Sequence, residues 1–348
     1  MQFIDAATTR RHLGMAPLIE ALRAMFISGC EVPARHTHRI ESGDGLSDTS
    51  GTLLLMPAWR PGALLGLKTV TIFPANGRLA VPALHSTYLL FDARTGVPLA
   101  QLDGNEITSR RTAAASALAA SFLARADASR LLIVGSGRVA SLLTEAMRAV
   151  RPITEVQVWN HRGVSAQALA QRLRDEGFVA RATDDLAHAA SAADIISCAT
   201  LSTTPLIRGE WLRPGTHLDL IGSFTAQMRE TDAACFAACR VFVDTEEALT
   251  KSGDVLQAIA QNSFSADRLQ GTLADLCAGR RRGREAAEGS DGAAGRTLFK
   301  SVGSALEDLA AAELVWRGVA SESLSCEAGA APAAPATPAT PDQPGLPS

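Results

Sequence analysis

The chain has 348 residues, a formal net charge of −3 and a hydrophobic content of 47%. This length is enough for two globular domains and too great for one small core. Lysine and arginine are scattered rather than gathered into a stripe, which argues against a nucleic-acid partner.

The sequence also argues against a membrane protein or a metalloprotein. Residues 1–11 lack the basic segment and apolar run of a secretory signal. No window approaches the about 18 apolar residues of a membrane span. The six cysteines show neither a zinc-ligand spacing nor a disulfide framework. We therefore expect a cytoplasmic protein with reduced thiols, no membrane partner and no metal.

The N-terminal part begins with an amphipathic helix from Ala16, which Gly29 can end. Short apolar runs separated by turn residues then predict a meandering sheet. The expected strands are residues 52–56, 64–73, 88–91 and 99–102, and an Ala-rich helix follows over 109–126.

The second part alternates strands and helices. Residues 130–134 form a continuous apolar run, typical of a strand buried on both faces. Further strands are expected over 155–159, 178–181, 195–199, 217–221 and 241–244. The pattern predicts an α/β fold with a Rossmann-type doubly wound parallel sheet that ends near Ala278. A last helix is expected over 298–316.

A glycine motif follows the first of these strands: Gly135-x-Gly137-x-x-Ala140. Such residues allow a tight turn, a close approach of the backbone to a pyrophosphate and close packing of helix on strand. Outside this context the motif could be an ordinary glycine-rich turn. Within it, we predict cofactor contacts for Gly135, Ser136, Gly137, Arg138, Val139 and Ala140.

The end of the next strand favours NADPH over NADH, although NADH remains possible. An NAD site usually has Asp or Glu here to bind the ribose hydroxyl. The chain instead has Asn160, His161 and Arg162, without a carboxylate between Gln157 and Gly163. Arg162 can pair with a 2′-phosphate. The alternative is a solvated turn in which Arg162 faces only water.

Several blocks occur in an order that resembles the ornithine cyclodeaminase and mu-crystallin family over residues 1–320. The resemblance implies a homodimer in which a Rossmann domain, residues 127–296, is inserted into an α+β substrate and dimerisation domain, residues 1–126 plus 297–320. Residues 321–348 lie outside it, and their Ala- and Pro-rich composition predicts disorder. The blocks are Val32–Arg35, Leu55–Pro57, Gly66–Val70, Leu90–Gly96, Asp103–Gly104, Thr108–Ala114, the Gly135 loop and Thr297–Gly303.

The resemblance also implies roles for single residues. Arg35, Lys68 and Arg111 would bind a substrate carboxylate, for which fixed cations are suited. Lys68 and His85 are the candidate catalytic residues, because either could supply a proton. A solvated arginine or a structural histidine is the alternative for Arg35 and His85. The further cofactor contacts implied are Thr112, Thr200, Gly222, Ser223 and Ser301.

Two departures from the family pattern reduce the number of reactions that this chain is expected to catalyse. The cyclodeaminase members resemble one another in carrying an Asp where this chain has Phe224 and a Glu where it has Leu54. Deamination of ornithine needs acid–base groups that these apolar residues lack. We therefore expect NAD(P)H-dependent reduction of a cyclic imino acid, Δ1-pyrroline-2-carboxylate or Δ1-piperideine-2-carboxylate. The alternatives are an ornithine cyclodeaminase, an alanine dehydrogenase and an NADP-dependent binding protein like the mu-crystallins.

Overall fold

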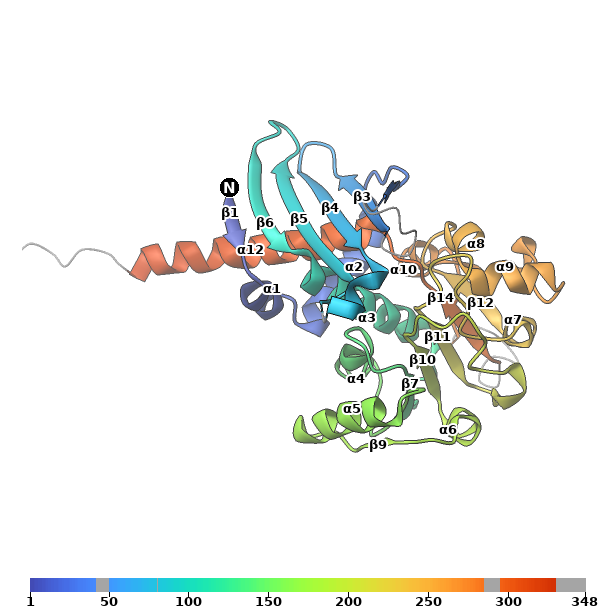
Figure 1. Ribbon diagram of the computed structural model, residues 1–348. Coiled ribbons are helices and arrows are strands. Elements are labelled where there is room, and N and C mark those ends of the chain that lie inside the picture. The colour runs from blue at the N-terminus through green and yellow to red at the C-terminus, as the bar shows by residue number, and fades with distance from the viewer. Residues whose placement is uncertain (42–49, 80, 285–294, 330–348) are drawn as a thin grey trace, which may run out of the picture.

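The computed structural model describes residues 1–41, 50–79, 81–284 and 295–329 and contains two β-sheets with helices packed against them (Figure 1). Within these ranges no helix combines the length and apolar character that crossing a bilayer requires.

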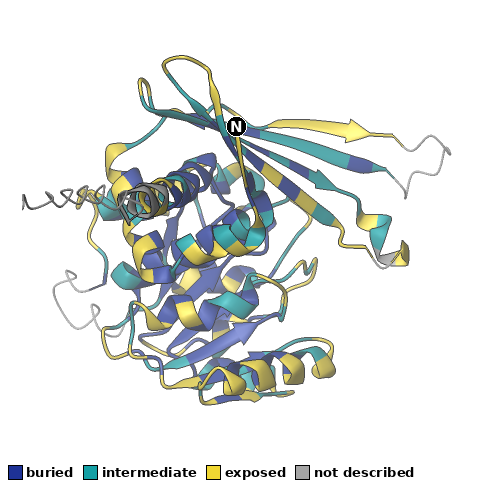
Figure 2. Ribbon diagram, turned by 90° about the vertical axis from the view of Figure 1, so that its left-hand side faces the viewer, coloured by how far each residue is buried: buried dark blue, intermediate teal, exposed yellow. Residues whose placement is uncertain are grey.

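The first sheet has six strands in the order β1-β6-β5-β4-β3-β2. All neighbours are antiparallel except β1 and β6. The sequence predicts the four central strands but misses β1 and β2. All residues of β2 are exposed, so it lacks the apolar alternation of a half-buried strand (Figure 2). The bounds are β1 Gln2–Ile4, β2 His36–Ile40, β3 Gly51–Trp59, β4 Leu64–Ile72, β5 Leu84–Asp92 and β6 Pro98–Asp103.

One face of this sheet is covered by helices. Met56, Lys68, Val70 and Tyr88 alternate along the strands and are buried on the same face. Helices α2 (Met15–Ser28), α3 (Gly104–Leu123) and α12 (Ala305–Gly329) pack together there, and α1 (Ala6–His12) adjoins them. We call this covered side the inner face and the opposite side the outer face.

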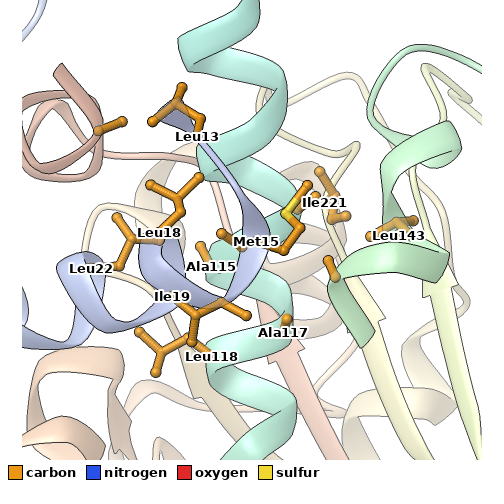
Figure 3. Packing of buried hydrophobic residues seen from close by; sticks show 14 of the residues in the cluster. Leu13, Met15, Leu18, Ile19, Leu22, Ala115, Ala117, Leu118, Leu143 and Ile221 are labelled. Carbon is orange, nitrogen blue, oxygen red and sulfur yellow. The ribbon is translucent and has the colours of Figure 1, made fainter. Parts of the chain in front are cut away.

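Helices α2 and α3 pack against each other, and small side chains of α3 such as Ala115 allow a close approach (Figure 3). Leu18 and Leu22 of α2 are fully buried beside Ala115 and Leu118 of α3. Burying each leucine contributes roughly 1.5–3 kcal/mol. This packing gives the first sheet a rigid support.

The second sheet is wholly parallel, in the order β13-β12-β14-β11-β10-β7-β8-β9. It confirms the doubly wound parallel prediction. Its strands are β7 Arg130–Val134, β8 Glu155–Trp159, β9 Ala180–Ala182, β10 Ile195–Cys198, β11 His217–Leu220, β12 Arg240–Val243, β13 Gly271–Thr272 and β14 Thr297–Lys300. The helices between them are α4 Leu143–Arg148, α5 Gly163–Asp175, α6 Leu186–Ala192, α7 Ala233–Ala238, α8 Ala248–Lys251, α9 Gly253–Ala260 and α10 Leu273–Cys277.

The C-terminal segment differs from prediction at both ends. Residues 297–300, expected in the first domain and partly in its last helix, form β14 between β11 and β12 of the second sheet. The last helix begins at Ala305 and not at Leu298. The prediction was wrong because a short apolar run does not distinguish a strand from a helix. It continues to Gly329, so residues 321–329 are helical rather than disordered, and residues 330–348 lie outside the described residues.

Candidate functional site

A cleft of about 540 Å³ lies at the carboxyl ends of β7, β8 and β10. Ligands of open parallel sheets bind at this edge. The cleft is lined by Gly135, Ser136, Gly137, Trp159, Asn160, His161, residues 199–204 and Leu206.

The glycine loop in this cleft leaves room for a backbone-bound anion. Gly135 has φ +117, and a Cβ there would lie 2.5 Å from the carbonyl oxygen of Ala199. At Gly137 a Cβ would meet open space, so the backbone itself faces the cleft. Ala140 is buried and begins a short 3-10 turn, Ala140–Leu142, which leads into α4. These features fit a dinucleotide pyrophosphate.

The tip after β8 is held by Asn160. Its Nδ2 donates to the Ser136 hydroxyl at 2.8 Å, and its Oδ1 accepts from the backbone N–H of Arg162 at 2.9 Å. His161 and Arg162 are both exposed. The amide of Asn160 therefore joins the glycine loop to the tip and leaves the Arg162 side chain in solvent beside the cleft.

A second cavity, of about 340 Å³, lies between the two sheets and continues from the cleft. Gly137, Ala199, Thr200 and Leu201 line both spaces. The cavity contains most of the side chains that the sequence singles out. Its predicted site residues are Arg35, Lys68, Arg111, Thr112, Gly137, Arg138, Val139, Thr200, Gly222 and Ser301.

Lys68 is buried on the inner face of β4, with 2% of its side chain exposed. Its Nζ lies 2.6 Å from Oδ2 of Asp308, at the start of α12. Burial lowers the pKa of Lys68 to about 8, and the Asp308 charge limits the decrease. The lysine is therefore mainly charged at neutral pH yet close to its point of deprotonation.

Arg111 lies beside Lys68 and contacts two carboxylates. Its Nε donates to Asp308 at 2.9 Å and its Nη1 to Glu307 at 2.6 Å. Burial opposes ionisation of Asp308, but Lys68 and Arg111 outweigh it and hold the pKa of Asp308 below its usual value. Burial raises the pKa of Glu307 to about 7. The neighbouring Arg110 instead donates to the carbonyl of Leu13, so only Arg111 of the two lines the cavity.

Sequence reasoning misses Glu307 and Asp308. Both carboxylates are fully buried and together contact Arg111 and Lys68. In the sequence they look like ordinary acidic residues in the first turn of a helix, which is where such residues are commonly found. The one signal available was their position just after the family block that ends at Gly303.

Arg35 closes one side of the cavity. Its Nη2 donates to the carbonyl of Gly303 at 3.0 Å and to Glu247 at 3.3 Å. The loop carrying Gly303 is held in turn by Asp244, whose Oδ2 accepts from the N–H groups of Val302 and Gly303 at 2.8 and 2.7 Å. The guanidinium thus reaches the same cavity as Lys68 and Arg111, from a different segment.

The rest of the cavity wall is largely apolar, and most of it comes from the same face of the first sheet as Lys68. Leu54, Met56, Val70, Ile72, Leu84 and Phe224 line it. The two positions that depart from the cyclodeaminase pattern, Leu54 and Phe224, therefore both face the site. This wall suits a hydrocarbon ring and provides no acid–base group.

Four predicted residues, Ala140, Arg162, His85 and Ser223, line neither the cleft nor the cavity, and the last two have other surroundings. His85 is exposed on β5 and points to the outer face, whereas its neighbour Leu84 lines the cavity. Ser223 is fully buried, and its hydroxyl donates to the carbonyl of Met228 at 2.6 Å and accepts from the N–H of Asp254 at 3.0 Å. Ser223 therefore supports the loop after β11 from behind.

Thr112 lines the cavity, and its hydroxyl donates to the Thr108 carbonyl at 2.6 Å.

Comparison with known proteins gives consistent matches over nearly the whole chain. The model of the ornithine cyclodeaminase/mu-crystallin family matches residues 3–323. An uncharacterised protein of Schizosaccharomyces pombe is 47% identical over 321 residues, which cover 91% of this chain and 97% of that protein. A Δ1-pyrroline-2-carboxylate reductase of Paracoccus denitrificans is 37% identical over 321 residues, 92% of this chain and 97% of that enzyme.

A solved structure is similar over the same extent. The Δ1-pyrroline-2-carboxylate reductase of Thermococcus litoralis, in complex with NADH and L-proline, matches with a TM-score of 0.85 and 28% identity. The match covers 93% of this chain and 98% of that enzyme.

Proposed function

The chain belongs to the ornithine cyclodeaminase and mu-crystallin family, and from this premise we propose that it reduces cyclic imino acids with NADPH or NADH. The substrates proposed are Δ1-pyrroline-2-carboxylate, giving L-proline, and Δ1-piperideine-2-carboxylate, giving L-pipecolate. A cavity of about 340 Å³ has room for either ring.

One observation carries the proposal. The nucleotide cleft runs into a cavity in which Lys68 and Arg111 lie among apolar side chains. Two of these side chains, Leu54 and Phe224, stand where the cyclodeaminase members of the family carry carboxylates. A ready-made imine needs a clamp for its carboxylate, one proton and a hydride. Arg111 and Lys68 fit the first two needs, because both can bind a carboxylate and Lys68 can donate a proton. The cleft fits the source of the hydride.

The residues for a nicotinamide cofactor are the glycine loop for its pyrophosphate and Asn160, His161 and Arg162 for its ribose end. When bound, the cofactor supplies hydride to the imine carbon. Because Arg162 is exposed and the tip has no carboxylate, we propose that NADPH is preferred.

The chain's own residues then account for binding and proton transfer. Within the described part of the chain, the hydrogen bonds of Arg111 to side chains use Nε and Nη1, which leaves Nη2 for a substrate carboxylate. Arg35 approaches the same space. Lys68, held by Asp308, binds the carboxylate or donates a proton to the imine nitrogen. The apolar wall excludes water from the electrophilic carbon.

We also propose a homodimer formed through the outer face of the first sheet. Two rows of apolar side chains cross this face, Pro57–Leu67–Leu89 and Trp59–Leu65–Phe91, and all six are only half-buried. A contiguous apolar patch of this kind is typical of a protein–protein interface. The proposed compartment is the cytoplasm, in keeping with the five free cysteines among the described residues.

The test is a panel in which NADPH and NADH are each offered with both imines and their oxidation is followed by absorbance. Reduction of at least one imine, faster with NADPH, is the expected result. Oxidation of NAD(P)H with pyruvate and ammonia would replace the proposal with an alanine dehydrogenase. Release of ammonia and proline from ornithine, with no net change in NAD(P)H, would replace it with a cyclodeaminase. Tight NADPH binding without turnover of any of these compounds would favour a binding protein.

A further inference from the structure

A buried carboxylate lies behind the junction of the cleft and the cavity. Glu230 is fully buried on the segment before α7. Its Oε1 accepts from the backbone N–H of Thr200 at 2.7 Å and from the Thr200 hydroxyl at 2.8 Å. Its Oε2 accepts from the N–H of Gly222 at 2.7 Å. Thr200 follows β10 and Gly222 follows β11, so one side chain joins the loops at the ends of two neighbouring strands.

Both loops are part of the site. Thr200 lines the cleft and the cavity, and Gly222 lines the cavity. The loops also touch each other, since a Cβ at Gly222 would lie 1.9 Å from the carbonyl oxygen of Thr200 and 2.4 Å from Oε1 of Glu230. Because the Thr200 hydroxyl donates to Glu230, it can serve a ligand only as an acceptor.

Glu230 is itself fixed in place. Oδ1 of Asp254, on α9, accepts from the N–H groups of Glu230 and Thr231 at 2.9 and 3.0 Å. Burial raises the pKa of Glu230 to about 7, the charge of Lys300 on β14 opposes this rise, and Asp254 adds to it. Burying a carboxylate is costly, and the three donors directed at Glu230 offset part of that cost. A carboxylate held this firmly keeps both loops in one conformation.

We infer that Glu230 is a positioning residue for the cofactor, which fixes the loops after β10 and β11 so that the nicotinamide end meets a preformed site. The inference rests on the proposed function, because it presupposes that NADPH or NADH fills the cavity. Glu230 does not line the cleft or the cavity, so it acts through Thr200 and Gly222.

The test compares Glu230→Gln with Asp219→Asn in the full-length protein. Gln offers one carbonyl oxygen and turns an NH₂ group toward an N–H donor, so one loop loses its anchor. The control removes another fully buried carboxylate, which accepts from the hydroxyls of Ser116 at 2.9 Å and of Ser197 and holds neither loop. NADPH affinity is measured by calorimetry and thermal stability by calorimetric melting.

We expect Glu230→Gln to weaken NADPH binding by about tenfold or more, since charge-assisted hydrogen bonds are lost. Asp219→Asn should lower the melting temperature but leave the Kd for NADPH near that of the wild type. At saturating NADPH, Glu230→Gln should retain most of its kcat. Equal Kd values for the wild type and Glu230→Gln, or equal weakening in both variants, would overturn the positioning role.

Hydrogen exchange on the cofactor-free wild type supplies a test that needs no variant. The amides of Thr200 and Gly222 should already be protected, because Glu230 rather than the cofactor holds them. Fast exchange that slows only when NADPH is added would overturn the inference, even if Glu230→Gln fails to fold. A wild-type protein that binds neither NADPH nor NADH would instead refute the proposed function.

Discussion

Replacing Lys68 with Met separates its role in catalysis from its role in stability. The pKa of Lys68 falls from 10.5 to about 8 on folding, so the charged form is disfavoured in the native state by roughly 3 kcal/mol. This cost is fully present below pH 8 and is relieved as the pH rises from there through 10.5, because the unfolded chain then holds the proton that the native state releases. Met removes the cost and keeps the volume.

Asp308, the partner of Lys68, keeps a second cation in the Lys68→Met variant. Asp308 also accepts from Nε of Arg111 at 2.9 Å, so it remains paired. The large penalty for leaving a buried charge alone, about 3–5 kcal/mol, should therefore not appear. We expect Lys68→Met to fold, to melt at or above the wild-type temperature at pH 7, and to bind NADPH normally.

Activity should respond in the opposite direction. The variant loses a charged hydrogen bond to the substrate of ~1.5–3 kcal/mol and, if Lys68 protonates the imine, a general acid that contributes ~10²–10⁴-fold. The kcat/KM for the cyclic imine should fall at least ~10²-fold. In the wild type, kcat/KM should decline as the pH rises through about 8, and the variant should lack this limb.

The assay is NADPH oxidation with each imine across this pH range, alongside thermal melts and NADPH titration. Arg172→Met is the control, since Arg172 is half exposed on α5 and pairs with Glu176 at 2.9 Å, and it should stay near wild-type activity. Near-normal turnover by folded Lys68→Met would refute the site, while an inactive but unfolded variant would refute the stability argument.

Three further predictions concern other parts of the molecule. Arg162→Ala should raise the KM for NADPH about tenfold and change that for NADH little, because one charge-assisted phosphate contact is lost; equal changes would exclude it as the phosphate reader. Asp308→Asn should lower the melting temperature and shift the basic limb of the pH profile downward, because Lys68 and Arg111 lose a shared carboxylate; an unchanged melt and profile would contradict the buried ion-pair network. Leu67→Asp puts a charge in the outer face, so light scattering should show monomers in place of dimers; an unchanged mass would place the interface elsewhere.

The sequence predicts the second sheet well because its strands are buried on both faces. The bounds of β7 and β8 are those expected from the continuous apolar run and from Glu155–Trp159. β2 has no such signal, since its five residues are all exposed and it is a strand only because β3 pairs with it. Its formation depends on tertiary pairing rather than local pattern.

The residues of the site likewise fall into some that the sequence predicts and some that it does not. Lys68 and Arg111 lie in recognisable blocks, and a lysine in the middle of an apolar strand is itself a signal. Glu230 and Asp308 have none, because a carboxylate becomes functional through the groups that surround it, and those come from distant segments. His85 is the reverse case, a residue that the sequence singles out but that lies outside the cavity. Strand alternation places its side chain on the outer face.

The position of β14 has a consequence for how the protein is made. Its neighbours β11 and β12 are synthesised earlier, and within the described ranges of the chain the sheet joins them only through Thr297–Lys300. Until this strand leaves the ribosome, both neighbours present open edges, which are prone to pair with other chains. A fragment ending at Ala278 carries the complete glycine motif and every other strand of the sheet. It would nevertheless leave the sheet in two pieces, so the nucleotide-binding unit can be produced only with the C-terminal segment attached.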